Sequence, residues 1–149
     1  MKVESTGSAL PYRCDQVFDL IAGIERYPEF LSGWLCARVV RRQADTLYVE
    51  QTVGFAALRL SFSSTAVLQR PHSIEISSTD EAFRRYSLRW HIQPVPPGCR
   101  IGVVAEIELA SRLLQLALQQ VMGTAIDDAI RAFEARAEAL YGSGEAVAR

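Results

Sequence analysis

Residues 111–141, SRLLQLALQQVMGTAIDDAIRAFEARAEALY, carry apolar side chains at steps of three and four positions. This spacing predicts one long α-helix, because residues three or four apart share a face of a helix that turns every 3.6 residues. The predicted apolar face consists of Leu114, Leu118, Met122, Ala125, Ala129, Phe133, Ala137 and Leu140. Burial of such a face is favourable, so the rest of the chain is expected to supply a surface that covers it.

The chain from residue 34 to residue 109 has a period of two instead, which is typical of antiparallel strands with one covered face. In LRLSFSSTAVL, residues 58–68, Leu58, Leu60 and Phe62 fall on one face, and the intervening arginine and serines fall on the other. The turn-forming stretches RRQADT, VGFA, QRPHS, TDEA and PVPPGC divide this region into six predicted strands. Residues 2–10 are expected to supply one more strand.

Two short helices are predicted between the first strand and the other six. The first covers about residues 13–22, and the second begins near Ile24 and ends around Ser32 and Gly33. The complete order predicts an α+β fold in which a curved antiparallel sheet of about seven strands surrounds a long C-terminal helix. A strongly curved sheet and a helix meet closely at one end and diverge at the other, so a wedge of space is expected between them.

The length of 149 residues fits a single domain, which we expect to cover residues 1–142. The remaining residues, 143–149, are small and polar and are predicted to be disordered. The longest apolar stretch, around residues 113–122, is far shorter than the roughly 20 residues of a membrane span, and the N-terminus lacks the apolar run of a signal peptide. We therefore expect a cytoplasmic protein, at most peripheral at the inner face of a membrane.

The net charge of −1 provides no overall field for a polyanion, so a DNA partner is not expected. The three cysteines, Cys14, Cys36 and Cys99, are far apart and show no metal or redox spacing. Free thiols in a reducing compartment are the simplest interpretation. We expect no metal, no catalytic cofactor and a monomer.

Five stretches of the chain occur in an order that is typical of a known family. They are LPYRCDQVFDLI…IERYPEFL, TVGF followed by LRLSF, the phenylalanine and RW of AFRRYSLRW, SRLL and AFEARAEALYG. Over about residues 9–142 the chain resembles the coenzyme Q-binding and RatA ribosome-association toxin family of the START-like, polyketide cyclase/dehydrase (SRPBCC) superfamily. The resemblance implies the helix-grip fold, in which the sheet grips the long helix.

The resemblance also implies a binding protein rather than an enzyme. Its coenzyme Q side implies a cavity for a polyprenyl quinone such as ubiquinone, supporting respiratory electron transport, with a possible contact to a membrane or a respiratory complex. Its RatA side implies the alternative, a toxin that binds the large ribosomal subunit and blocks subunit association. A cyclase or hydratase activity, known in the wider superfamily, is a weaker alternative.

The aromatic segment RYPEFLSGW, residues 26–34, has two interpretations. Its side chains either form an ordinary buried corner or cover a lipophilic cavity as a flap, and the family resemblance favours the flap. Whether the segment moves is not encoded in its residue types. Its candidate ligand-binding residues are Tyr27, Pro28, Phe30, Leu31 and Trp34.

Further candidate ligand-binding residues follow from the strand and helix patterns, although most apolar residues with this spacing are plain core. Gln51 and Ser64 interrupt apolar faces and could meet a polar headgroup or be solvated at a strand end. Tyr86 and Trp90 are the expected aromatic neighbours of a quinone ring. The remaining candidates on inward faces are Phe55, Leu58, Phe62, Leu114, Leu118, Val121 and Met122.

Two groups of arginines are candidates for a ribosome or partner surface. They are Arg38, Arg41 and Arg42 in one group and Arg84, Arg85 and Arg89 in the other. The alternative is a solvated sheet face on which the second group pairs with Glu106 and Glu108. His72 and His91 show no obvious nucleophile partner, so the sequence predicts no catalytic residues.

Overall fold

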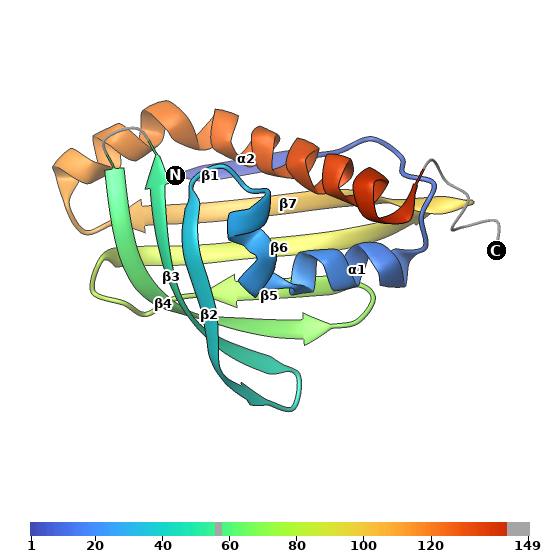
Figure 1. Ribbon diagram of the computed structural model, residues 1–149. Coiled ribbons are helices and arrows are strands. Elements are labelled where there is room, and N and C mark those ends of the chain that lie inside the picture. Colours follow the sequence, from blue (N-terminus) through green and yellow to red (C-terminus); the bar gives the residue numbers. More distant parts are fainter. Residues whose placement is uncertain (56–57, 143–149) are drawn as a thin grey trace.

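A single antiparallel sheet and a long helix dominate the computed structural model (Figure 1), which describes residues 1–55 and 58–142, with only the backbone of Phe55. The predicted disordered tail, residues 143–149, lies outside the described residues, so the predicted domain boundary stays a prediction. The elements are β1 (Lys2–Thr6), α1 (Cys14–Ala22), the 3-10 helix η1 (Ile24–Glu29), β2 (Trp34–Gln43), β3 (Thr46–Phe55), β4 (Leu58–Gln69), β5 (Ser73–Ser77), β6 (Phe83–Val95), β7 (Gly98–Leu109) and α2 (Arg112–Tyr141).

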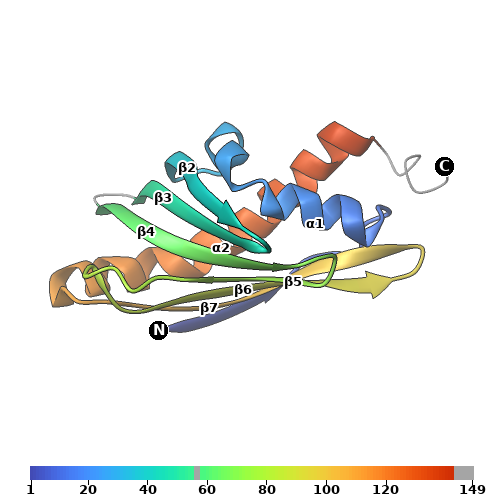
Figure 2. The ribbon, with the colours of Figure 1, turned by 90° about the horizontal axis from the view of Figure 1, so that it is seen from below.

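The strands lie in the order β1-β7-β6-β5-β4-β3-β2, and each described pairing is antiparallel. Figures 1 and 2 show that β2 and β3 turn well away from the direction of β6 and β7, so the sheet is strongly curved. The inner face carries the apolar alternation that the sequence predicts. The predicted α+β, helix-grip arrangement of seven strands, two short helices and one long helix is therefore confirmed.

The C-terminal half of α2 makes the firmest contact with the rest of the molecule. Phe133 is completely buried, and its ring lies 5.5 Å from that of Tyr27, 5.4 Å from that of Phe30 and 5.2 Å from that of Trp90. Near the end of the helix, the Tyr141 hydroxyl donates a hydrogen bond to the carbonyl of Gln16 over 3.0 Å. These contacts fix α2 against η1, α1 and β6.

The N-terminal half of α2 is held more loosely. The Ser111 hydroxyl caps the helix by accepting a hydrogen bond from the amide of Leu114. Leu113 and Leu116, which lie off the predicted apolar stripe, are 77% and 59% exposed. The helix therefore reaches the sheet along a narrower stripe than its composition suggests.

We predict that Gly123→Ala stabilises the protein by about 1 kcal/mol, because glycine inside a helix costs about that much relative to alanine. Gly123 lies within α2, and a Cβ added there meets nothing within 4 Å. The free energy of unfolding from urea titrations checks this.

Gly98→Ala is the contrasting variant. A Cβ at Gly98 would lie 1.7 Å from the carbonyl oxygen of Leu10, so this substitution must displace the backbone and destabilise the fold. A loss of stability in Gly123→Ala comparable to that in Gly98→Ala would contradict the open space beside α2.

Candidate functional site

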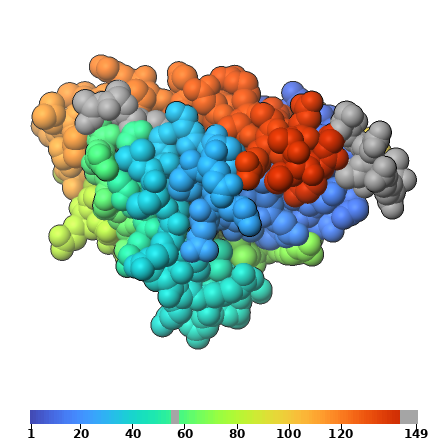
Figure 3. Space-filling view, in the orientation of Figure 1, coloured from blue at the N-terminus to red at the C-terminus, as the bar shows by residue number. Residues whose placement is uncertain are grey.

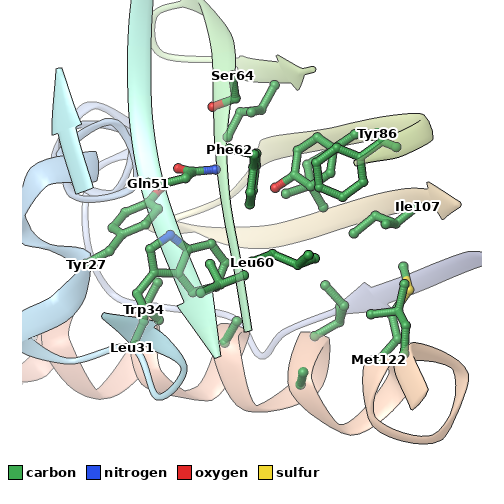
Figure 4. A pocket seen from close by; sticks show the side chains of 18 of the residues that line it. Tyr27, Leu31, Trp34, Gln51, Leu60, Phe62, Ser64, Tyr86, Ile107 and Met122 are labelled. Atoms are coloured by element: carbon green, nitrogen blue, oxygen red, sulfur yellow. The ribbon is translucent and has the colours of Figure 1, made fainter. Parts of the chain in front are cut away.

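An enclosed apolar cavity lies between the sheet and the N-terminal half of α2 (Figure 4). Its volume is about 80 Å³, and a buried water requires roughly 10–15 Å³ by the same kind of measure. The lining residues come from every layer of the fold: Ile24, Tyr27, Leu31, Trp34, Gln51, Val53, Leu58, Leu60, Phe62, Ser64, Ile76, Phe83, Tyr86, Leu88, Trp90, Ile107, Leu109, Leu118, Val121, Met122, Ala125, Ile126 and Ala129. In this structure the cavity has room for a few waters but not for a large ligand.

Three polar side chains form what we call the polar corner of the cavity: Gln51, Ser64 and Tyr86. Gln51 and Ser64 are only 6% and 5% exposed. Gln51 pairs with Phe62 across β3 and β4, and Ser64 follows Phe62 on the same face of β4, so the strand register brings the two polar groups together. The predicted alternative, solvation at a strand end, is therefore wrong, because both positions lie inside their strands.

The hydrogen bonds of the polar corner are incomplete. The side chain of Gln51 donates to the hydroxyl of Tyr86, and Figure 4 shows these two groups pointing toward each other beside Phe62. The Ser64 hydroxyl is buried and has no hydrogen-bond partner among the described residues. A buried hydroxyl without a partner costs free energy, so the Ser64 hydroxyl favours a ligand atom that can accept a hydrogen bond from it.

Burial also determines the ionisation of the tyrosines in the cavity wall. It raises the pKa of Tyr86, and the hydrogen bond from Gln51 opposes part of that rise. Burial likewise raises the pKa of Tyr27, whose hydroxyl donates to the carbonyl of Ile21. Both side chains are therefore neutral hydrogen-bonding groups at physiological pH.

An aromatic cluster flanks the polar corner. The ring centroids of Phe62 and Phe83 are 4.8 Å apart, and that of Tyr86 lies 5.1 Å from Phe62 and 4.8 Å from Phe83. Phe62 comes from β4 and the other two residues from β6. A flat ring bound at the polar corner would lie beside these aromatic side chains.

The segment of residues 26–34 divides its side chains between the two sides of the cavity wall. Tyr27 and Leu31 are buried and, with the half-buried Trp34, line the cavity. Phe30 lies outside, against Phe133 and 5.1 Å from the guanidinium of Arg136. The segment is thus a packed corner and the wall of a cavity at once.

Most of the predicted ligand-binding residues meet around the cavity. Pro28, Phe30 and Leu114 are the described ones that do not line it. Pro28 is exposed on η1, Phe30 packs outside, and Leu114 precedes the part of α2 that faces the cavity. The side chain of Phe55 lies outside the described residues.

The structure also adds lining residues that sequence reasoning missed. Ile107 continues the inward alternation of β7, so the strand pattern could have found it. Phe83 is out of step with the inward residues of β6, because an irregular register lies between Phe83 and Arg85, so the pattern could not have placed it in the cavity wall. Ala125 and Ala129 lie on the predicted apolar face of the long helix, but an alanine on that face does not by itself indicate a cavity. The other additions are Ile24, Val53, Ile76, Leu88, Leu109 and Ile126.

The second group of arginines, Arg84, Arg85 and Arg89, is engaged in ion pairs on the outer face of the sheet. Arg85 pairs with Glu106 at 2.9 Å, Arg89 with Glu75 at 2.9 Å, and Arg84 with Glu108 at 4.0 Å. These exposed pairs fit the interpretation of a solvated sheet face and contribute little stability.

The first group of arginines lies along β2. Arg38 pairs with Glu50 at 3.0 Å, and the guanidinium of Arg41 lies 4.3 Å from the ring centre of Tyr48.

Within residues 1–55 and 58–142, no helix is long and apolar enough to cross a membrane. The same residues contain no cluster of histidine, cysteine, aspartate and glutamate that could hold a metal ion.

A curved antiparallel sheet closed by a long C-terminal helix over an internal cavity defines a START-like helix-grip protein. The chain belongs to the polyketide cyclase / dehydrase and lipid transport family, which matches residues 10–134. This membership confirms the superfamily that the sequence motifs indicate.

Two relatives carry different names. The ribosome association toxin RatA of Vibrio cholerae is 26% identical over 143 residues, which cover 95% of this chain and 99% of the toxin. The mitochondrial coenzyme Q-binding protein COQ10 of Dictyostelium discoideum is 27% identical over 139 residues, covering 90% of this chain and 68% of that protein. Both sides of the predicted family are therefore represented.

Solved structures share the fold. The 18 kDa protein CC1736 from Caulobacter crescentus is 30% identical, with a TM-score of 0.78 and coverage of 95% of this chain and 99% of that one. The Zhui aromatase/cyclase from a Streptomyces species has a TM-score of 0.81 over 93% of both chains but is only 14% identical, which indicates a shared fold alone.

We predict that Ser64→Ala stabilises the unliganded protein by about 1 kcal/mol, because it removes a buried hydroxyl that has no partner. Ser63→Ala, on the exposed face of the same strand, is the matched control and should change the free energy of unfolding by less than about 0.5 kcal/mol. Urea titrations measure both. If Ser64→Ala destabilised the protein while Ser63→Ala did not, the Ser64 hydroxyl would have a hydrogen-bond partner in the folded protein, which contradicts the prediction.

The buried tyrosines predict a loss of stability at alkaline pH. The pKa values of Tyr27 and Tyr86 are raised above 10.0, so the unfolded chain releases these protons first. Their contribution is complete below pH 10 and is lost as pH rises further, at up to about 1.4 kcal/mol per pH unit for each group. Urea midpoints between pH 8 and 11 should fall less steeply in Tyr86→Phe, and an equally steep fall would contradict the assignment.

Proposed function

We propose that the protein binds a lipophilic small molecule in the cavity and that a prenylated quinone of the ubiquinone type is its ligand. The observation that carries this proposal is the polar corner inside an otherwise apolar enclosure. An apolar pocket with a few convergent polar groups is the usual form of a small-molecule site. The family description includes lipid transport, and one relative is named for coenzyme Q binding.

The quinone headgroup matches the polar corner in chemistry. Its ring carbonyls accept hydrogen bonds, which the free hydroxyl of Ser64 and the amide of Gln51 are able to donate. The flat ring would lie beside Phe62 and Tyr86, and Trp90 contributes a further aromatic wall. Each methylene of the tail that leaves water adds about 0.8 kcal/mol to binding.

The proposed role is that of a binding protein or chaperone that supports respiratory electron transport, not that of an enzyme. The polar cavity-lining side chains are an amide, a hydroxyl, two indoles and two neutral phenols, which are poor acids and bases near pH 7. A cyclase or hydratase remains the weaker candidate, since the structural likeness to an aromatase/cyclase concerns the fold. We propose a cytoplasmic location with peripheral contact to a membrane or respiratory complex.

A quinone requires the cavity to enlarge. The present 80 Å³ is below the roughly 300–1,000 Å³ of typical ligand sites. Residues 26–34 are the proposed mobile wall, because this short 3-10 helix and turn cover the cavity with side chains from a single segment. The flap interpretation of the segment is thus part of this proposal.

A second candidate function is binding to the large ribosomal subunit with inhibition of subunit association. The observation that favours it is the name of relatives such as the Vibrio cholerae toxin RatA. The proposed contact surface is the two arginine groups, of which Arg85 and Arg89 are each 63% exposed. The exposed ion pairs of these arginines are weak, so a guanidinium that leaves its glutamate to bind a phosphate of the ribosomal RNA would lose little free energy.

Mass spectrometry of an organic extract of protein purified without detergent tests the first function. We expect a prenylated quinone near one per chain, and Leu118→Arg should abolish its retention by placing a charge in the cavity wall. Met122→Phe, which only fills space, should reduce retention at least tenfold and serves where Leu118→Arg fails to fold. A clean extract from folded wild-type protein argues against the quinone.

Ribosome co-sedimentation tests the second function. The double variant Arg85→Glu with Arg89→Glu reverses charge on the outer sheet face and should abolish co-sedimentation while leaving quinone retention intact. Leu118→Arg should have the opposite pattern. Loss of both activities in a folded double variant would contradict the assignment of two separate surfaces.

A further inference from the structure

A shallow groove runs along the outside of α2, directly beside the cavity. It has a volume of about 360 Å³ and is lined by Phe30, Ser32, Gln120, Val121, Thr124, Ala125, Asp128, Ala129 and Ala132. Figure 3 shows atoms of η1 and the start of β2 lying against α2 on this face of the molecule. The groove follows the line along which these two parts meet.

Three residues line both the groove and the cavity: Val121, Ala125 and Ala129. They are spaced by four positions and form one stripe of α2, which we call the seam. The stripe of Leu118, Met122 and Ile126 faces the cavity, and the stripe that begins at Thr124 faces the groove. Each stripe is rotated by about 60° from the one before, so the seam lies between inside and outside.

The seam is closed by small side chains over part of its length. Ala125 and Ala129 are half-buried and present only a methyl group toward the η1–β2 turn. Beyond Ala129 the contact becomes firm, because Phe30 packs on Phe133 and Arg136 pairs with Glu29 at 2.9 Å. The segment of residues 26–34 is therefore fastened beyond the Ala129 end of the seam, and the seam itself consists of Val121 and two alanines.

The cavity cannot contain a long ligand, but the groove lies on the other side of the three seam residues. We propose that the seam is the passage for the ligand and that the groove holds the part of its apolar tail that the cavity does not accommodate. This proposal rests on the proposed quinone-binding function. It adds a second binding subsite, selective for a slender, flexible chain, whose solvent rim is formed by Gln120, Thr124 and Asp128.

Tail length then determines affinity. Each buried methylene contributes about a fourfold gain in affinity, so a tail that crosses the seam should bind much more tightly than the headgroup alone. Ala129→Phe fills the seam, and Ala132→Phe fills the groove without lining the cavity. Ala135→Phe places the same ring on an exposed part of α2 outside both and is the matched control.

The protein provides its own optical probe, because its two tryptophans, Trp34 and Trp90, both line the cavity. Quenching of their fluorescence measures binding of a ubiquinone headgroup that carries no tail, two isoprene units or four. In the wild type and Ala135→Phe, affinity should rise at least about tenfold from no tail to four units. The ratio of the affinity for the four-unit probe to the affinity for the tail-free probe should be at least about tenfold lower in Ala129→Phe and Ala132→Phe.

The outcomes separate this proposal from the function on which it rests. No binding of any probe to the wild type overturns the quinone function and the subsite with it. Headgroup binding with no dependence on tail length, or an undiminished ratio in both seam and groove variants, overturns the subsite alone.

A photoreactive diazirine at the end of a four-unit tail tests the same point on the wild-type protein, should the variants fold poorly. Label recovered on residues that line the groove alone, such as Thr124, Asp128 or Ala132, supports the groove, whereas label confined to residues that line the cavity overturns it.

Discussion

The packing of Phe133 against Tyr27, Phe30 and Trp90 is the interaction on which the rest of the structure depends. It fixes α2 to η1 and β6 at one point of a 30-residue helix that is about 45 Å long. A helix of that length cannot follow a sheet that curves away from it. The firm contacts of Phe133, Arg136 and Tyr141 all lie in the C-terminal part of the helix, and the cavity occupies the space beside the stretch from Leu118 to Ala129.

The chemistry of the cavity follows from which strand positions face this space. The inner faces of β3 and β4 are apolar except at Gln51 and Ser64, which the register brings together on neighbouring strands. The hydrogen bond between Gln51 and Tyr86 satisfies one part of this corner and leaves Ser64 without a partner. Most buried polar groups in natural proteins have a hydrogen-bond partner. A buried hydroxyl without one is therefore unusual, and such exceptions are expected mainly at functional sites.

The two candidate functions use different surfaces of one scaffold. The cavity and its groove lie on the helix side of the sheet, and the arginines Arg85 and Arg89 lie on the opposite, solvated face. Relatives named for coenzyme Q binding and for ribosome association therefore do not require different folds. A shared fold does not by itself fix a function, so the site must be argued from its own residues.

The sequence by itself determined the element order, the inward faces of the strands and the long helix, because these follow from local periodicity and turn residues. It also indicated Gln51 and Ser64, since each interrupts an apolar face. Only the tertiary structure decided that Phe30 packs outside while Leu31 lines the cavity, that Arg85 pairs with Glu106 beside an irregular register at Phe83, and that Ala125 and Ala129 form a seam. These features depend on the register of the strands and on the distance between the helix and the sheet. Neither the register nor that distance is encoded in the type of any one residue.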